Sequence, residues 1–360
     1  MKKQTCSRTK QDGFTIVELM VAATLGVLIL AGAISMLSTN KRVYTEQDEM
    51  GRLQENARFA LDLLIRDIRM AGYAGCADDV DEVVNHVNGF DDPTDIHYFI
   101  AVEGSENTGN WLPGNSTDEV ANMVANSDGI TIRYLSPTGI FVVAPYMTTA
   151  SAAIHTTTES ELEKGDLISI SDCSSADVVV ITSNPSDPPC SSDTDVTCKS
   201  SFNHNTGTVT GAEPGNWLKD LSKTYTGDAG ILRFYAARYY VGNDANGRPV
   251  LRRMTGVDKV SGAVVVNDLV EGVESLQVLY GEDTTGSAMI ADTYVNAAAV
   301  TNWDNIVSVR IALLMRTVAE YGPDVNDNTY DLLGTTINPV DDRRRRRVFT
   351  ATIQVRNRSS

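Results

Sequence analysis

A single carboxylate stands in the longest apolar stretch of this 360-residue chain. Residues 14–37 contain one charged side chain, Glu18. As a helix with a rise of about 1.5 Å per residue, this stretch would extend roughly 36 Å, which is enough to cross a hydrocarbon core of about 30 Å. An acidic side chain at mid-membrane costs on the order of 3 kcal/mol, so Glu18 calls for a partner outside its own segment.

A secretory signal peptide or a simple signal anchor would also explain an apolar run near the N-terminus. A secretory signal is cleaved after its apolar run, behind small residues in an A-x-A-like pattern. Residues 38–42 read Ser-Thr-Asn-Lys-Arg and offer no such site, whereas Gly13 stands where the polar leader meets the apolar run. A signal anchor gives no reason for Glu18 at this position.

The leader and this junction resemble the prepilin signal of type IV pilins and type II secretion pseudopilins. That signal is a basic leader ending in glycine, then Phe-Thr-Leu-(Ile/Val)-Glu-Leu-(Met/Leu); residues 13–20 read Gly-Phe-Thr-Ile-Val-Glu-Leu-Met. The resemblance implies that a prepilin peptidase cleaves after Gly13 and that Phe14 is N-methylated. It also implies that Glu18 neutralises the N-terminal amine of a neighbouring subunit during filament assembly.

The composition indicates an acidic body that faces water. The formal net charge is −17, and because the leader 1–13 carries four basic residues and one acidic residue, the chain after it is near −20. This excess argues against a general nucleic-acid binder, so no nucleic-acid partner is expected. A hydrophobic fraction of 42% allows a sizeable core, in one or two domains after the membrane helix.

Four cysteines remain once the leader is removed with its Cys6: Cys76, Cys173, Cys190 and Cys198. An even number in an exported domain predicts two disulfides, with three pairings open. Cys190 and Cys198 lie close together in a Pro/Ser/Asp-rich stretch, which favours their pairing and leaves Cys76 with Cys173. Four reduced thiols are the alternative. No Cys-x-x-Cys pair is present, so a zinc ribbon or a thioredoxin-type site is not expected.

No grouping of residues predicts catalysis, a metal site or a cofactor. The four histidines have no HExxH spacing and are expected at the surface: His86, His97, His155 and His204. Residues 324–328 match the first three ligand positions of a calcium loop, but Thr329 and Thr335 replace its required glycine and glutamate. We therefore expect a solvated turn there and predict that the chain is not an enzyme.

The strongest basic feature is the run Arg343–Arg347, which follows two aspartates. One hypothesis is contact with anionic lipid headgroups or DNA. The alternative is an exposed loop whose arginines pair with the acidic head. The acidic charge of the body favours this alternative.

Residues 38–72 continue the helix beyond the membrane. No proline interrupts residues 14–71, which would form a rod on the order of 87 Å, and Gly72 predicts its end. Apolar residues at spacings of three and four predict a stripe that the chain's own head covers: Leu53, Ala57, Ala60, Leu61, Leu64, Ile65, Ile68 and Ala71. The opposite face is expected to carry Arg52, Glu55, Arg58, Asp62, Arg66 and Asp67, with an ion pair between Asp62 and Arg66.

Beyond residue 72, alternating and β-branched patterns predict a β-rich head. Strands are expected at 129–135, 166–171, 177–182, 232–241, 250–254, 307–314 and 348–355, with a turn at 242–247 that makes a hairpin. Residues 269–281 read as helix or strand, with strand favoured at their end, and 183–206 read as a loop. The predicted fold is α+β and pilin-like, a long membrane-spanning N-terminal helix whose distal half packs against an antiparallel β-sheet. The expected organisation is leader 1–13, membrane half 14–37, periplasmic half 38–72 and head 73–360, with a variable region at about 77–228.

Two further stretches resemble the PilW family of type IV minor pilins. Residues 52–76 are similar to that family's "RLQENARFA…L…D.R.AGY.GC" pattern, and residues from about 230 to 358 resemble it as well. The resemblance implies a subunit of the inner membrane with a periplasmic head, which passes into the pilus, at its tip. It implies a role in priming pilus assembly, in support of motility and adhesion. The implied partners are other minor pilins, the major pilin, an inner-membrane assembly platform and a tip adhesin.

Three other functions stay open at this point. The nearest is a type II secretion pseudopilin of the GspJ kind, which has the same architecture. A second is a ligand-binding or surface-binding module in the variable region 77–228. A third, a membrane-anchored hydrolase, has no motif behind it.

Overall fold

The computed structural model describes residues 13, 15–75, 83–88, 100–106, 123–157, 162–183, 185, 200–209, 212–257, 264–286, 290–321, 323–355 and 357. Its elements are α1 (Ile16–Met70), β1 (Val83–Asn85), β2 (Val87–Asn88), β3 (Val102–Ser105), β4 (Gly129–Phe141), β5 (Ile154–Thr156), β6 (Leu167–Ser171), β7 (Ala176–Val180), β8 (Ser200–Phe202), β9 (Gly207–Val209), β10 (Ala212–Asn216), β11 (Gly230–Asn243), β12 (Pro249–Val257), β13 (Val264–Glu271), β14 (Val273–Glu282), β15 (Thr293–Val295), the short 3-10 helices η2 (Ala297–Ala299) and η3 (Trp303–Asn305), β16 (Ile306–Arg316), β17 (Tyr330–Leu332), β18 (Thr335–Ile337) and β19 (Arg346–Gln354).

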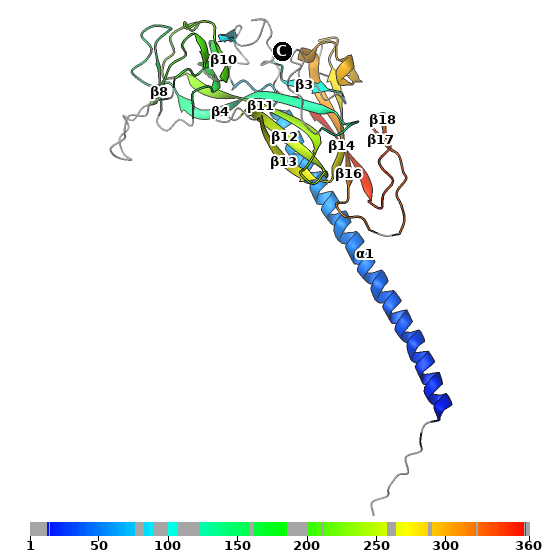
Figure 1. Cartoon of the computed structure of the whole chain (residues 1–360). Helices are drawn as coiled ribbons and strands as arrows, with labels where there is room; N and C mark the ends of the chain where they lie inside the picture. The colour runs from blue at the N-terminus through cyan, green and yellow to red at the C-terminus, as the bar shows by residue number, and fades with distance from the viewer. Residues whose placement is uncertain are drawn as a thin grey trace, which may run out of the picture.

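The helix α1 is one uninterrupted rod that leaves the head as a long stalk (Figure 1). It begins after Thr15, whose hydroxyl accepts a hydrogen bond from the Glu18 amide and so satisfies one of the unpaired amides of the first turn. It ends before Gly72, which has φ +76, and a Cβ there would lie 2.2 Å from the carbonyl oxygen of Asn357. The predicted glycine stop at Gly72 is therefore confirmed by its backbone conformation.

Two sheets enclose the distal half of α1. An eight-stranded sheet has the order β1-β7-β6-β11-β12-β13, with β4 paired to the long strand β11 and β3 paired to β4. A four-stranded antiparallel sheet has the order β15-β14-β16-β19. Neighbours in the larger sheet are antiparallel except for β1 and β7. The fold is thus α+β, with a long N-terminal helix and antiparallel-rich sheets, as predicted.

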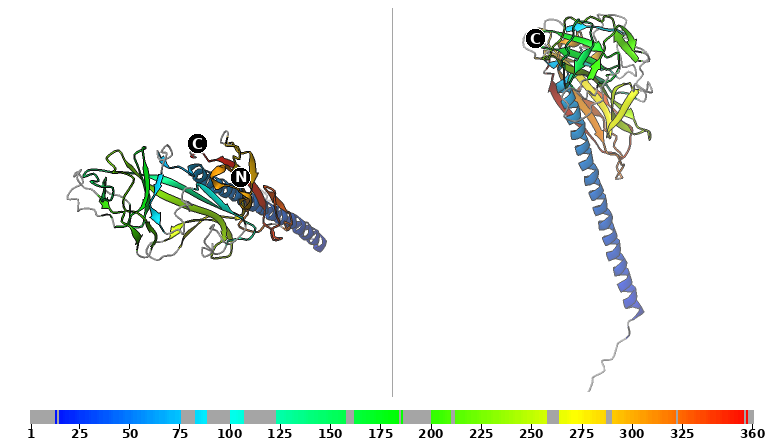
Figure 2. Two further views of the ribbon diagram at one scale, coloured as in Figure 1. Left: turned by 90° about the horizontal axis from the view of Figure 1, so that it is seen from above. Right: turned by 90° about the vertical axis from the view of Figure 1, so that its left-hand side faces the viewer.

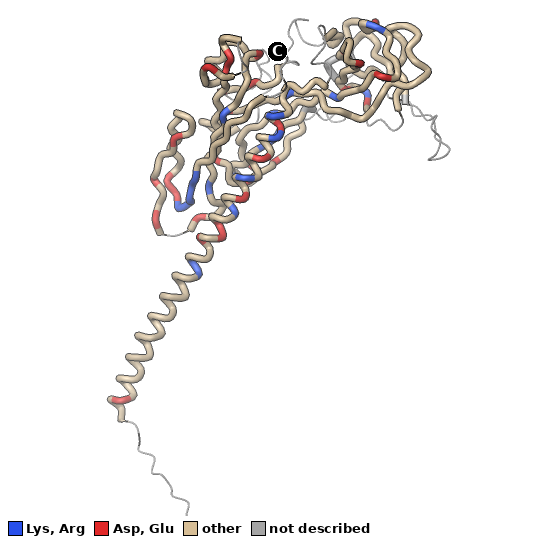
Figure 3. The backbone as a smooth tube through the Cα atoms, turned by 180° about the vertical axis from the view of Figure 1, so that it is seen from behind, with Lys and Arg blue, Asp and Glu red and all other residues tan. Residues whose placement is uncertain are grey.

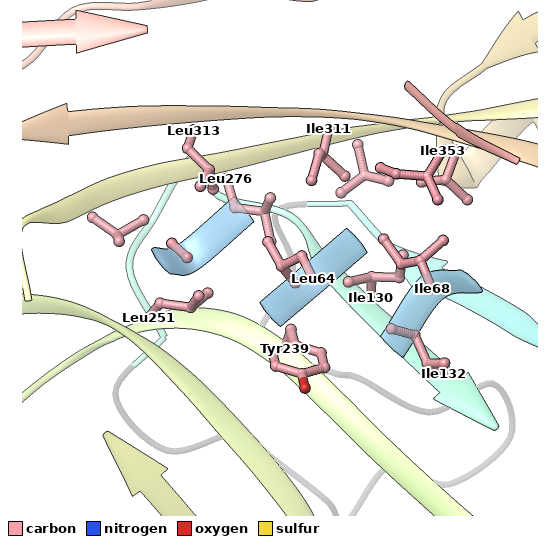
Figure 4. Packing of buried hydrophobic residues seen from close by; sticks show 14 of the residues in the cluster. Leu64, Ile68, Ile130, Ile132, Tyr239, Leu251, Leu276, Ile311, Leu313 and Ile353 are labelled. Carbon is pink, nitrogen blue, oxygen red and sulfur yellow. The ribbon is translucent and has the colours of Figure 1, made fainter. Parts of the chain in front are cut away.

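The main core is the layer between these two sheets, where the helix lies (Figure 4). Leu64 and Ile68 are fully buried there, between Tyr239 and Leu251 of the larger sheet and Ile311 and Leu313 of the smaller one. Burying a leucine or isoleucine side chain stabilises a protein by about 1.5–3 kcal/mol, so this one stripe fixes the helix in the head. The predicted stripe is confirmed: its fully buried members are Leu53, Ala57, Ala60, Leu64, Ile68 and Ala71.

The opposite helix face differs from the prediction in the burial of one residue and in one ion pair. Asp67 is only 3% exposed, because it lies seven residues after Ala60 and therefore on the same side of the helix. Asp62 pairs with Arg58 at 3.8 Å, and Arg66 instead turns to Asp67 at 3.4 Å. The buried carboxylate of Asp67 is the better partner for Arg66, since it lacks the water that surrounds Asp62.

A second core lies away from the helix, in the part of the molecule that extends to the left in Figure 1 and in the view from above in Figure 2. We call this part the distal lobe and define it as β1, β2 and the described residues of 142–229. Its core includes Ile168, Phe202 and Tyr225, and small sheets β5-β8 and β2-β10-β9 close it. Except for its last residue, Ala229, the lobe falls within the predicted variable region 77–228.

The predicted strands are present with small shifts in their ends. The hairpin of β11 and β12 turns at 244–248, and residues 269–281, whose conformation was ambiguous, divide between β13 and β14 around Gly272. Strand β8 lies inside the predicted loop 183–206, so that prediction was wrong at its end. It forms because it pairs with β5, far away in sequence.

Candidate assembly site

The N-terminal half of α1 is an apolar rod with no cover. It is the one helix among the described residues that is long and apolar enough to cross a membrane, and none of the residues in its most apolar stretch is buried. Large side chains such as Ile16, Leu28 and Ile34 are 64–80% exposed. Figure 3 shows that this half carries almost no charge, in contrast to the half inside the head. Apolar surface of this extent requires lipid or other apolar helices around it.

Glu18 lies in the first turn of this rod and is exposed. A carboxylate at this end is favoured by the partial positive charge of the helix N-terminus. Gly13 is also exposed, and a Cβ added there would meet no atom within 4 Å. Phe14 and the leader up to residue 12 lie outside the described residues, so Gly13 as a cleavage site, Phe14 as a methylation site and Glu18 as an assembly residue stay predictions.

Polar contacts fix the position of the helix in the head. The main one, between Tyr239 and Asp67, was not predicted from the sequence. The hydroxyl of Tyr239 on β11 donates a short hydrogen bond to the buried Asp67 carboxylate. Burial raises the pKa of Tyr239, and the bond to the Asp67 carboxylate raises it further, so its hydroxyl keeps its proton at neutral pH. Asn56 donates to the carbonyl of Glu271 at 3.3 Å, and Asn357 donates to that of Arg69 at 3.1 Å.

The arginine run is bound within the head. Arg346, whose side chain is 1% exposed, bridges Glu274 and Asp342 at 2.5 and 2.7 Å. Arg344 contacts Asp342 at 3.5 Å and Arg343 contacts Glu320 at 3.5 Å. Further contacts are Arg345 to Glu46 of the helix and Arg347 over the Phe349 ring. Pairing with the acidic head is thus the arrangement in the structure, and Arg346 is buried where an exposed loop was expected.

One cysteine of the predicted disulfides is described. Cys173 is disulfide-bonded and sits in the tight turn between β6 and β7, with φ +64. Cys76, Cys190 and Cys198 lie outside the described residues. The pairing of Cys76 with Cys173 therefore stays a prediction.

The histidine prediction was wrong for two residues. His86 and His204 are each 1% exposed, both inside the distal lobe, while His97 lies outside the described residues. His86 bonds to Asp177, which is 91 positions away in the chain, so no local pattern could reveal its burial. In the calcium-like stretch, Asn326 bonds to Tyr330 and to the carbonyl of Arg344 instead of facing water. Among the described residues, no group of three or more His, Cys, Asp or Glu could hold a metal ion.

Comparison with known families gives two matches. Residues 238–357 match the family model described as Type IV Pilus-assembly protein W, abbreviated PilW, and residues 8–34 match the Prokaryotic N-terminal methylation motif. The first match contains β12, β13 and the whole four-stranded sheet; the second contains the junction at Gly13, Glu18 and most of the exposed apolar rod. No curated protein and no solved structure matches the chain.

Proposed function

We propose that the chain, which its two family matches support as a PilW-like type IV minor pilin, takes part in priming pilus assembly. In this proposal it acts in a complex with other minor pilins, at the pilus tip. PilW proteins are structural components of the pilus, and we assign this chain no enzymatic role.

The observation that carries the proposal is the combination of the bare apolar rod with its single carboxylate. While the rod lies in a membrane, lipid chains cover its apolar side chains. When the subunit leaves the membrane, only other apolar helices can replace the lipid. Glu18, which lies in the first turn, then meets the N-terminal amines of neighbouring subunits if these are cleaved at the position of Gly13. An ion pair offsets the cost of an acidic group in this apolar surrounding.

The same proposal includes the division of the chain, its partners and the phenotype that it supports. Residues 1–13 are the leader that a prepilin peptidase removes, 14–37 span the inner membrane once, and 38–72 and the head 73–360 lie in the periplasm. The partners are other minor pilins, the major pilin, a tip adhesin and the inner-membrane assembly platform. The phenotype supported is pilus-dependent motility and adhesion.

Replacement of Glu18 by alanine tests the assembly role. We expect the Glu18→Ala protein to be cleaved and inserted in the membrane at the normal level but to be depleted from sheared pili. The matched control is Glu55→Ala, which removes an exposed acid from the same helix inside the head region. Equal recovery of both variants in pili would show that Glu18 has no pairing role.

Deletion of the gene distinguishes a pilus subunit from a secretion pseudopilin. Loss of surface pili and twitching, with normal secretion of exoproteins, is the expected result. Loss of secretion alone would select the pseudopilin of the GspJ kind.

A further inference from the structure

The segment 217–228 crosses the distal lobe without regular structure and is held there by polar contacts; we call it the strap. The Trp217 amide donates to the carbonyl of His86 at 2.6 Å, and the Leu221 amide donates to that of Ala150 at 3.1 Å. Lys223 pairs with Asp172 in the β6–β7 turn. The strap carries two large exposed apolar side chains, Trp217 at 52% and Leu218 at 59%.

A fully buried carboxylate, Asp177 on β7, is the centre of these contacts. It accepts four hydrogen bonds: from His86 Nε2 at 2.5 Å, the Ser222 amide at 2.9 Å, the Ser222 hydroxyl at 2.6 Å and the Tyr225 hydroxyl at 2.5 Å. Burial raises the pKa of Asp177, but the bonds from His86, Ser222 and Tyr225 outweigh it and hold the pKa below its usual value. The carboxylate is therefore ionised and binds strap, β7 and the β1–β2 junction together.

Two imidazoles are buried in the same lobe. Because an ionised carboxylate and a carbonyl can only accept, Nε2 of His86 donates to Asp177, and Nε2 of His204 donates to the carbonyl of Ala152 at 3.1 Å. The other ring nitrogen, Nδ1, is buried in both residues with no hydrogen-bond partner among the described residues. Burial lowers the pKa of His204 and outweighs the carbonyl of Ala152, which raises it.

We propose that His86, His204 and Asp177 form an acid-sensitive latch, which holds the strap at neutral pH and releases it, with Trp217 and Leu218, when the pH falls. The reason is a charge count. Asp177 is held by His86, Ser222 and Tyr225, and the described residues of the lobe offer no second buried carboxylate that could balance an imidazolium at His204.

Burial decides the net direction of the pKa shift of His204, which is downward; of the groups that face His204, the backbone of Ala152 and of Lys219 on the strap raises its pKa and the ring of His86 lowers it. None of these three groups is an anion. The lobe's buried anion, Asp177, is already bonded to His86, and Asp172 is paired with Lys223. The hydroxyl of Tyr225 is neutral, since burial and the Asp177 carboxylate raise its pKa.

The pKa values of His204 and Asp177 determine in which direction, and over which pH range, the stability of the closed lobe changes. The pKa of His204 is lower in the closed lobe than the value of about 6.5 for a free histidine, so the open form binds the proton more tightly and the closed form loses stability below about pH 6.5. Asp177 keeps its charge at this pH, because its pKa lies below the ordinary value near 4. Between pH 6.5 and about 4, the histidine effect therefore acts alone.

Hydrogen exchange of the mature full-length protein in detergent tests the latch. Protection of the strap peptide, corrected for the intrinsic exchange rate, is compared at pH 7.5 and 5.0 with that of a β11 peptide. We expect strap protection to fall at pH 5.0, by about tenfold for each unit by which the pKa of His204 is lowered and by about thirtyfold at most, because pH 5.0 lies about 1.5 units below the free value; β11 protection should stay constant. His204→Gln can still donate to Ala152 and cannot titrate, so it should remove the fall.

The matched control is His155→Gln, on strand β5 of the same lobe, which should show the same fall as the parent protein. Constant strap protection in the parent protein overturns the latch, even if His204→Gln does not fold. A fall that persists in folded His204→Gln overturns it as well.

Discussion

Replacement of Arg346 by methionine should destabilise the head strongly, whereas the same replacement of Arg343 should not. The guanidinium of Arg346 bridges Glu274 and Asp342 with five contacts to acceptors, including the carbonyl of Val340. Burial lowers the pKa of Arg346, but the bonds to Glu274 and Asp342 outweigh it and raise the pKa overall, so it is charged at any physiological pH.

The expected loss of unfolding free energy in Arg346→Met depends on how well Glu274 and Asp342 remain paired without the guanidinium. Removing one member of a buried ion pair costs about 3–5 kcal/mol, because the remaining charge stays buried without compensation. Here Arg316 still contacts Glu274 at 3.2 Å and Arg344 still contacts Asp342 at 3.5 Å, so we expect the lower end of that range, about 3 kcal/mol. Arg343 contacts Glu320 with both side chains about half exposed, so Arg343→Met should cost less than about 0.5 kcal/mol.

Urea denaturation of the mature protein in detergent, followed by near-ultraviolet circular dichroism, measures both effects. Both variants replace an arginine by a methionine, so the effects of the lost charge and of the shorter side chain are common to both and cancel when their unfolding free energies are compared. Equal losses of unfolding free energy in the two variants would refute the reasoning, as would an unchanged midpoint for Arg346→Met. A changed denaturant slope would mean that two-state analysis does not apply to that variant.

Three other predictions concern processing, disulfides and pH. Gly13→Val should block cleavage. Because a Cβ at Gly13 meets no atom within 4 Å of this chain, the block must arise at the peptidase. A mature N-terminus at Phe14 in this variant, detected by mass spectrometry, contradicts the cleavage prediction. In the mature protein no cysteine should react with a thiol reagent before reduction, and Cys173→Ser should expose one thiol, at Cys76; a label elsewhere contradicts the pairing. Burial, and after it the Asp67 charge, raises the pKa of Tyr134 from 10.0 to about 12, so its contribution to stability is complete below pH 10 and is lost as the pH rises through 12. Denaturation midpoints from pH 9 to 12 should therefore fall, and should fall less in Tyr134→Phe.

The helix was the most predictable part of the fold because its signals are local. Apolar spacing, the absence of proline and the terminal glycine all act within a few residues, and each appears in the structure. Asp67 shows the limit of that reasoning. Its angle around the helix places it with Ala60 and Leu64, but its charge suggested the opposite face. The partner that makes its burial tolerable, Tyr239, lies 172 positions away in sequence.

The arginine run and the histidines show the same limit in the head. The acidic charge of the body correctly indicated that the arginines pair within the head, but the choice of Arg346 as the buried member depends on where β14 places Glu274. The burial of His86 and His204 depends on strand pairings that no local pattern encodes. The junction at Gly13 and Glu18 was found because its motif is contiguous, and its chemistry still requires partners outside this chain.

The contacts of α1 imply that stalk and head move as one body. An apolar stripe alone permits a helix to slide or rotate by one turn, since one leucine can replace another at similar cost. Here polar contacts exist at both ends of the enclosed segment: Ala319 donates to Glu49 at 3.3 Å near the stalk, and Asn357 donates to the carbonyl of Arg69 at the far end. Between them, Asp67 accepts from Tyr239 in the core. A shift of one turn would break all three and leave the Asp67 carboxylate buried without its donor, so a pull on the apolar rod during assembly must carry the head with it.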